Sequence, residues 1–180
     1  VKFLLILILL PVLQQQWFVP FIVNWIEGPS NFPWSAHLSS GGDSLAFPYG
    51  PVMFLSNLPS TYLGWVIDQM LGIGYFAGVG FRLSLFAADV FLLVFILQIF
   101  ETHWKRILIF YWLSPLVLFI TYFHGQSDVI PVAFLVFALT FIKHRSFARA
   151  GLFLGCSIAA KHSMLIGVPF IIIYLWSRNG

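Results

Sequence analysis

Charge is scarce in this chain of 180 residues. Only 8% of the residues are charged, with nine Lys and Arg against six Asp and Glu, whereas about 25% is usual in globular domains. So few charged side chains do not cover the surface of an ordinary soluble domain. A net charge of +3 is also too small for the basic surface that nucleic-acid binding needs. The composition therefore excludes a soluble globule and a nucleic-acid-binding protein.

Cysteine is almost absent as well, since Cys156 is the only one. One cysteine cannot form a disulfide within the chain, so the sequence does not indicate the redox compartment. The motifs of soluble enzymes are missing too, because the chain has no GxxxxGK phosphate loop, HExxH zinc motif, CxxC pair or GxSxG nucleophile elbow. No motif for a metal or an organic cofactor is therefore present, and a requirement for a divalent metal stays open.

Apolar residues are abundant instead, at 60% of the chain with a mean hydropathy of +0.94. Phe occurs 21 times, which suits lipid-facing helices with Trp and Tyr at their ends. A membrane helix needs about 20 mainly apolar residues, so the sequence predicts one all-α domain over residues 1–180, a polytopic transmembrane helical bundle. The predicted segments are the end of a first span at 3–13, then 51–71, 78–100, 107–123, 129–142 and 150–176, the last broken near 161–163.

The longest hydrophilic connection covers residues 14–50 and contains no Lys or Arg. Within it, residues 18–26 are apolar with a Trp near each end, which predicts a helix lying along the membrane surface. Because cytoplasmic loops are rich in Lys and Arg, the loops at 101–106 and 143–149 should face the cytoplasm, and the loop 14–50 the opposite side. An odd number of membrane crossings is needed between these loops, but only two apolar segments lie there. We therefore expect either a re-entrant or extra short helix at 72–80, or one misplaced loop.

Several polar side chains occur within or beside the apolar segments, where each is a functional candidate because charge in a membrane is costly. Arg82 and Asp89 are seven residues apart, on one helix face but too distant to touch, so each needs a partner on another helix or in a polar cavity. The turn 124–128 is either a polar connector or a binding site for phosphate or sugar hydroxyls. Lys161 is either a cap of a broken helix or the counter-charge of a bound phosphate.

The order of several short motifs resembles the membrane glycosyltransferases of the C superfamily, GT-C. These motifs are Phe47-Pro48-Tyr49-Gly50-Pro51, Arg82-Leu83-Ser84-Leu85 with Asp89, Ser114-Pro115 before His124-Gly125-Gln126-Ser127-Asp128, and Gly151 to Gly155 before Lys161 and Pro169. The pattern is most similar to the N-terminal part of transferases that use polyprenyl-phosphate mannose, the branch related to GPI mannosyltransferase I. It covers about residues 14–176.

The resemblance implies a multi-pass enzyme of a bacterial plasma membrane or the ER membrane, and this chain would be the N-terminal part of a larger module. Such an enzyme moves a hexose such as mannose from a polyprenyl-phosphate donor to a glycan or lipid acceptor on the extracytoplasmic face. The family carries an acidic motif at the end of the first helix, where this chain has Gln14 to Gln16. Asp43 or Glu27 is then left as the general base that an inverting transfer needs.

The resemblance also implies roles for other residues. His124, Lys161 and Arg82 would face the lipid phosphate, because charge develops on the leaving group. Gln126 and Asp128 would orient the sugar. Two aromatic side chains offer flat faces for the sugar or the prenyl chain, although both also suit an interfacial aromatic belt, namely Tyr49 and Trp34.

Two other classes of function fit the same composition: a fragment of a transporter or flippase, and a non-catalytic membrane scaffold. A transferase should bring Asp43 or Glu27 to the turn 124–128, around one cavity at the exterior surface. A transporter should instead gather three charged groups at mid-membrane, namely Arg82, Asp89 and Lys161.

Overall fold

The computed structural model describes residues 1–179, and within them all regular secondary structure is helical, without a strand. The α-helices are α1 (Lys2–Ile8), α2 (Val19–Glu27), α3 (Pro33–Ser39), α4 (Pro51–Leu71), α5 (Phe76–Ile99), α6 (Trp104–Ile107), α7 (Pro115–Leu118), α8 (Val129–Lys143), α9 (Phe147–Ala160) and α10 (Gly167–Asn179). Short π- and 3₁₀-helical segments are η1 (Gln14–Phe18), η2 (Glu101–His103), η3 (Leu108–Trp112), η4 (Phe119–Phe123) and η5 (His162–Ile166). The all-α part of the prediction is confirmed.

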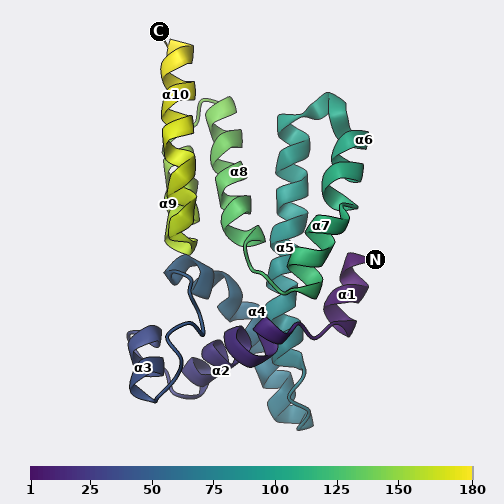
Figure 1. Cartoon of the computed structure of the whole chain (residues 1–180), viewed down its shortest axis with the longest axis vertical. Coiled ribbons are helices and arrows are strands. Elements are labelled where there is room, and N and C mark those ends of the chain that lie inside the picture. Colours follow the sequence, from purple (N-terminus) through teal and green to yellow (C-terminus); the bar gives the residue numbers. More distant parts are fainter. Residues whose placement is uncertain (180) are drawn as a thin grey trace.

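Helix α5 runs through the centre of the molecule (Figure 1). On one side of it stand α8, α9 and α10, and on the other side α6, α7 and α1, while α2 lies across the lower half (Figure 1). Helix α2 covers almost the same residues as the predicted surface helix at 18–26. Its apolar side carries Phe21 and Ile22 into the core, which explains why this segment of the long loop is helical and held against the bundle.

Helices α4 and α5, which cover the apolar segments predicted at 51–71 and 78–100, form a tightly packed antiparallel hairpin. A Cβ atom on Gly64 would collide with the carbonyl of Phe76, and one on Gly80 with the carbonyl of Ser60. The small residues therefore let the two backbones approach closely. The extra short helix considered for 72–80 is absent, because Gly72 ends α4 in the left-handed conformation (φ 68°) and α5 already begins at Phe76.

The hairpin is fixed by Asp68 in the last turn of α4. Its Oδ1 atom accepts hydrogen bonds from the backbone N–H groups of Tyr75 and Phe76, both at 2.8 Å, and Oδ2 accepts one from Ala77 at 2.7 Å. The first N–H groups of a helix have no partner within it and favour a negative charge. Asp68 thus caps α5 from the neighbouring helix.

Helix α1 is held against α5 by buried polar contacts. The Nζ atom of Lys2 lies 2.6 Å from Oδ2 of Asp89, and Nε of Arg82 donates to the carbonyl of Ile6 at 2.7 Å. Asp89 also accepts hydrogen bonds from two phenols, those of Tyr111 and Tyr122. The prediction that Arg82 and Asp89 need separate partners on other elements is confirmed, although the sequence did not identify Lys2 as one of them.

Three predicted apolar segments are interrupted, the first two next to a proline. The first helix ends at Ile8 rather than Leu13, because Pro11 disfavours helical backbone at the residue before it. The segment 107–123 bends by 47° at Ser114, where Pro115 starts a new helix. The expected break at 161–163 is confirmed: Lys161 is extended (φ −151°, ψ 117°) between α9 and η5.

One described helix, α5, is long and apolar enough to cross a membrane. The bent pair Glu101–Trp112 and Pro115–Phe123 adds a second candidate if it counts as one span. Helix α4 has 21 residues, but its Asn, Asp and hydroxyl side chains lower its hydropathy, and α8 and α9 are shorter than 18 residues. Judged by the length and composition of their helices, residues 1–179 therefore do not establish a polytopic transmembrane bundle.

Replacing Asp68 by Ala should lower the free energy of unfolding by about 1.5–3 kcal/mol, because three backbone donors lose a charged acceptor. The matched control is Glu101→Ala, which removes a carboxylate that is 74% exposed and pairs with Lys143. That change should cost less than about 1 kcal/mol. Denaturant titration in mild detergent, followed by circular dichroism, measures both, and equal losses would contradict the capping role.

Replacing Asp89 by Leu should destabilise the protein by about 3–5 kcal/mol, because the buried ammonium of Lys2 loses its counter-charge. The double substitution Lys2→Met with Asp89→Leu removes both charges and should recover part of that loss. A double-mutant cycle on unfolding free energies measures the coupling. If the two single losses simply add in the double variant, the two residues are not coupled in this way.

Candidate functional site

Four polar side chains converge where α4 begins, α8 begins and α9 ends. The Nζ atom of Lys161 lies 2.6 Å from Oδ1 of Asp128 and 5.6 Å from the ring centroid of Tyr49. The Tyr49 hydroxyl donates to Oε1 of Gln126 at 3.3 Å. We call Tyr49, Gln126, Asp128 and Lys161 the junction cluster. The sequence predicted all four as site residues, and the structure brings them together.

A backbone contact between α4 and α9 sets the position of the junction cluster. The N–H of Gly50 donates to the carbonyl of Ala160 at 2.9 Å. A Cβ atom at this position would collide with the carbonyl of Ala159, so only glycine allows the approach. Since Tyr49 precedes Gly50 and Lys161 follows Ala160, the contact places these two side chains next to each other.

The long loop 14–50 contacts the turn 124–128 at both of its ends. At one end Tyr49 reaches Gln126, and at the other the amide of fully buried Gln14 donates to the carbonyl of Gly125 at 3.2 Å. Gly125 has a φ of 86°, which turns the chain there. Sequence reasoning missed this role of Gln14. Only the structure indicates this role: Gln14 begins the π-helical segment η1, and π-helical segments often occur at functional sites.

The junction cluster combines an accessible ion pair with a buried phenol. The side chains of Lys161 and Asp128 are 29% and 38% exposed, so a ligand can reach both charges. Burial raises the pKa of Tyr49 to about 12, and the negative charge of Asp128 adds to the effect. The phenol is therefore neutral at physiological pH and remains a hydrogen-bond donor.

Three other predicted binding residues lie outside the junction cluster. His124 is exposed and stacks on Phe119, with ring planes 7° apart. The Nε1 atom of Trp34 donates to the carbonyl of Phe47 at 3.2 Å, which places Trp34 in the aromatic core between α2 and α3 rather than beside the ion pair. Arg82 binds α1 through its Nε atom, as described above.

The two predicted catalytic carboxylates do not join the junction cluster either. Asp43 is exposed, and its Oδ1 atom accepts a hydrogen bond from the N–H of Leu45 at 2.8 Å, which closes a local turn. Glu27 is exposed and accepts a hydrogen bond from Nε1 of Trp65 at 3.2 Å. Both side chains thus serve local contacts, and the carboxylate beside Lys161 is that of Asp128.

The mid-membrane site expected of a transporter is not formed by its three predicted groups. Asp89 pairs with Lys2, Arg82 with the carbonyl of Ile6, and Lys161 with Asp128. The first two contacts both join α1 to α5, whereas Lys161 and Asp128 pair between the end of α9 and the start of α8, so the three charges do not surround one site.

An apolar groove of about 320 Å³ lies between α4, α5 and α8. Its lining combines small and aromatic side chains, including Ser56, Ser84, Ala88, Phe91, Ile130 and Phe134. Ile130 lies in the first turn of α8, two residues after Asp128, and Ser56 in the second turn of α4. The groove therefore begins close to the junction cluster and has the character of a site for a hydrocarbon chain.

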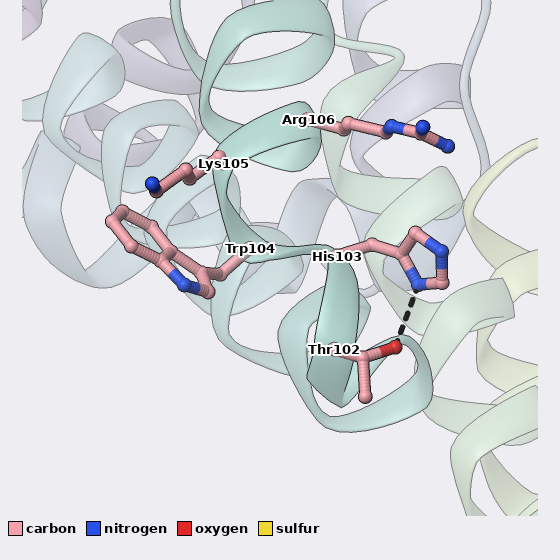
Figure 2. A pocket seen from close by; sticks show the side chains of 5 residues that line it. All are labelled: Thr102, His103, Trp104, Lys105 and Arg106. Carbon is pink, nitrogen blue, oxygen red and sulfur yellow. Dashed lines mark hydrogen bonds between the residues drawn. The ribbon is translucent and has the colours of Figure 1, made fainter.

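A second, polar concavity lies at the turn between α5 and α6 (Figure 2). Figure 2 shows Lys105 beside the ring of Trp104, 5.5 Å from its centroid, and Arg106 directed away from them. The ring nitrogen Nδ1 of His103 is 2.9 Å from the hydroxyl of Thr102 (Figure 2). Two basic side chains without a carboxylate among the lining residues suit contact with anionic surfaces, and the cytoplasmic location of this turn stays a prediction.

Comparison with protein-family models, with curated proteins and with solved structures finds no match for this chain. Within residues 1–179, no group of three or more His, Cys, Asp or Glu side chains is placed to hold a metal ion. The function of the junction cluster has to be inferred from its own residues.

Stability should fall at alkaline pH because of Tyr49. Its folded pKa of about 12 exceeds the ordinary value of 10.0, so the stabilisation is complete below pH 10 and is lost as the pH rises toward 12. In that window the unfolding free energy of the wild type should decrease by up to about 1.4 kcal/mol per pH unit more than that of Tyr49→Phe. Denaturant titrations between pH 9 and 12 compare the two, and identical slopes would contradict the assignment.

Proposed function

We propose that this chain forms part of an integral-membrane glycosyltransferase of the GT-C type. It would move a hexose such as mannose from a polyprenyl-phosphate donor to a glycan or lipid acceptor at the extracytoplasmic surface. The observation that carries the proposal is the junction cluster, an accessible Lys–carboxylate pair beside an aromatic face and near one end of an apolar groove. The apolar composition and the membrane-capable helix α5 support a membrane setting.

The donor is expected to bind with its phosphate at Lys161. As the bond between the anomeric carbon and the phosphate oxygen breaks, negative charge grows on the phosphate, and the ammonium stabilises it. The neutral phenol of Tyr49 adds a hydrogen-bond donor and a flat face. The groove between α4, α5 and α8 then receives the prenyl chain, because its apolar lining starts in the first turn of α8 and the second turn of α4, the two helices that begin at the cluster.

The acceptor hydroxyl is expected to bind at Asp128. Its oxygen attacks the anomeric carbon, the phosphate departs with the bonding electron pair, and the hydroxyl proton passes to the Asp128 carboxylate. Gln126 orients the sugar through its side-chain amide. Asp128 is proposed as the base in place of Asp43 and Glu27, because those two carboxylates are held in local contacts outside the junction cluster, whereas Asp128 belongs to it.

The arrangement expected of a transferase is not formed by Asp43 or Glu27, and the competing functions lack their expected arrangements as well. A transporter would use Arg82, Asp89 and Lys161 at one site, whereas these residues have separate partners. A passive scaffold has no need for an ion pair that is about one third exposed beside a hydrocarbon groove.

The test is sugar transfer from a radiolabelled polyprenyl-phosphate donor by the full-length protein in proteoliposomes. Asp128→Asn and Lys161→Met should each lower the transfer rate by about 100-fold or more, the size of a lost general base or charge stabilisation. The matched controls are Glu101→Gln and Lys143→Met, a surface ion pair of 3.1 Å elsewhere in the chain, and both should transfer like the wild type.

Asp43→Asn and Glu27→Gln should also retain transfer, since neither carboxylate touches the junction cluster. Full activity in Asp128→Asn together with its loss in Asp43→Asn or Glu27→Gln would overturn the assignment of the base. Wild-type protein that binds the lipid donor but transfers no sugar, while moving it between leaflets, would favour a flippase.

A further inference from the structure

The polar concavity at the turn between α5 and α6 has room for a ligand. Its volume is about 440 Å³, and its lining consists of Thr102, His103, Trp104, Lys105 and Arg106 (Figure 2). Ordinary ligand sites have volumes of about 300–1,000 Å³. All five lining residues are exposed, so a ligand can enter from outside the protein.

The basic side chains of this concavity have no acidic partner. Lys105 and Arg106 take part in none of the ion pairs found within residues 1–179. Glu101, which precedes the lining residues in the chain, is already paired with Lys143 at 3.1 Å. The same Nζ atom of Lys143 donates to two carbonyls in the last turn of α5, which holds this pair in place. The concavity therefore keeps its positive charge and favours an anionic ligand.

Arg106 and His103 supply hydrogen-bond donors that suit a phosphate group. The planar guanidinium of Arg106 presents a fork of N–H groups that fits two phosphate oxygens. Nδ1 of His103 lies 2.9 Å from the hydroxyl of Thr102. When this hydroxyl donates to Nδ1, the neutral ring carries its proton on Nε2, which is then a further donor. Both side chains extend away from Trp104, to the same side of the turn (Figure 2), so one phosphate can bind to both.

The concavity also lies at the level where phospholipid headgroups are expected. Helix α5 has 24 residues and is long enough to cross a membrane, since 1.5 Å per residue gives about 36 Å against a hydrocarbon core of about 30 Å. The lining residues follow within seven positions of its last residue, Ile99. Phe100 and Trp104 are 54% and 51% exposed, and aromatic side chains of this kind are enriched at the membrane–water interface.

We propose that this concavity binds the phosphate of an anionic phospholipid headgroup, such as that of phosphatidylglycerol. Arg106 and His103 bind the phosphate oxygens, and the ammonium of Lys105 adds positive charge. Trp104, whose ring centroid is 5.5 Å from that ammonium, lies at the boundary between headgroups and acyl chains. The orientation predicted from the sequence places this end of the molecule at the cytoplasmic leaflet, which is rich in anionic lipids.

This lipid site is separate from the junction cluster and does not depend on the proposed sugar transfer. Helix α8 connects the two regions, because Asp128 caps its first residue and Lys143 is its last. Its 15 residues keep the regions about 22 Å apart. Arg106→Gln should therefore transfer sugar like the wild type, and Asp128→Asn should bind phosphatidylglycerol like the wild type. Each proposal can then fail without the other.

The test is native mass spectrometry of the full-length protein released from detergent micelles, which measures its affinity for the first bound lipid. Arg106→Gln should weaken binding of phosphatidylglycerol by about tenfold, because the charged fork is lost. Trp104→Ala should weaken it by about threefold. The matched control is Arg145→Gln, which removes an exposed Arg from the turn between α8 and α9, outside the concavity. It should change the affinity by less than about twofold, as expected of a charge that does not touch the ligand.

Equal weakening in Arg106→Gln and Arg145→Gln would show a diffuse attraction and overturn the site. Equal affinity of the wild type for phosphatidylglycerol and for zwitterionic phosphatidylcholine would overturn it as well. Calorimetric titration with inorganic phosphate distinguishes the other source of the same chemistry. If Arg106→Gln loses inorganic phosphate while its affinity for phosphatidylglycerol is unchanged, the site takes free phosphate and the lipid assignment is wrong. The replaced side chains are exposed, and the melting temperature without lipid checks that each variant is folded.

Discussion

The contact between Gly50 and the last turn of α9 determines where the functional groups of this protein meet. One hydrogen bond, from the N–H of Gly50 to the carbonyl of Ala160, brings together segments that are 110 residues apart in the chain. No side chain lies between the two backbones, so the residues on either side, Tyr49 and Lys161, come within reach of each other. The ion pair with Asp128 and the hydrogen bond to Gln126 then follow from that placement.

Buried polar contacts hold much of the rest of this apolar protein together. Asp68 satisfies three backbone donors of α5, and Asp89 combines an ion pair with two phenols. In surroundings of low polarity such contacts are strong and specific, because an unmatched polar group has no water to bind. Arg82 is a buried cation without an acid among its described contacts, and its Nε atom donates to the carbonyl of Ile6.

All four residues of the junction cluster could be predicted as site residues from the sequence. Lys161 and Asp128 were recognisable because charges are rare in this chain, and Tyr49 because it lies in a Pro- and Gly-containing entry to a helix. Which carboxylate is the catalytic candidate could not be predicted from the sequence. Asp43, Glu27 and Asp128 all occur in polar segments, and only their contacts show that the first two serve a local turn and a Trp side chain.

The sequence by itself determined the long helices and the broken segment near Lys161, since apolar run length and its interruptions act locally, but it did not predict α3, the early end of α1 or the bend before Pro115. It placed α4 at 51–71 and the break at Lys161, and it required partners for Arg82 and Asp89. The tertiary structure decided which partners these are, because Lys2 reaches Asp89 and Ile6 reaches Arg82 only after the chain folds back on itself. Gln14 reaches the turn 124–128 in the same way. Sequence patterns do not encode such distant pairings, which depend on how closely helix backbones approach.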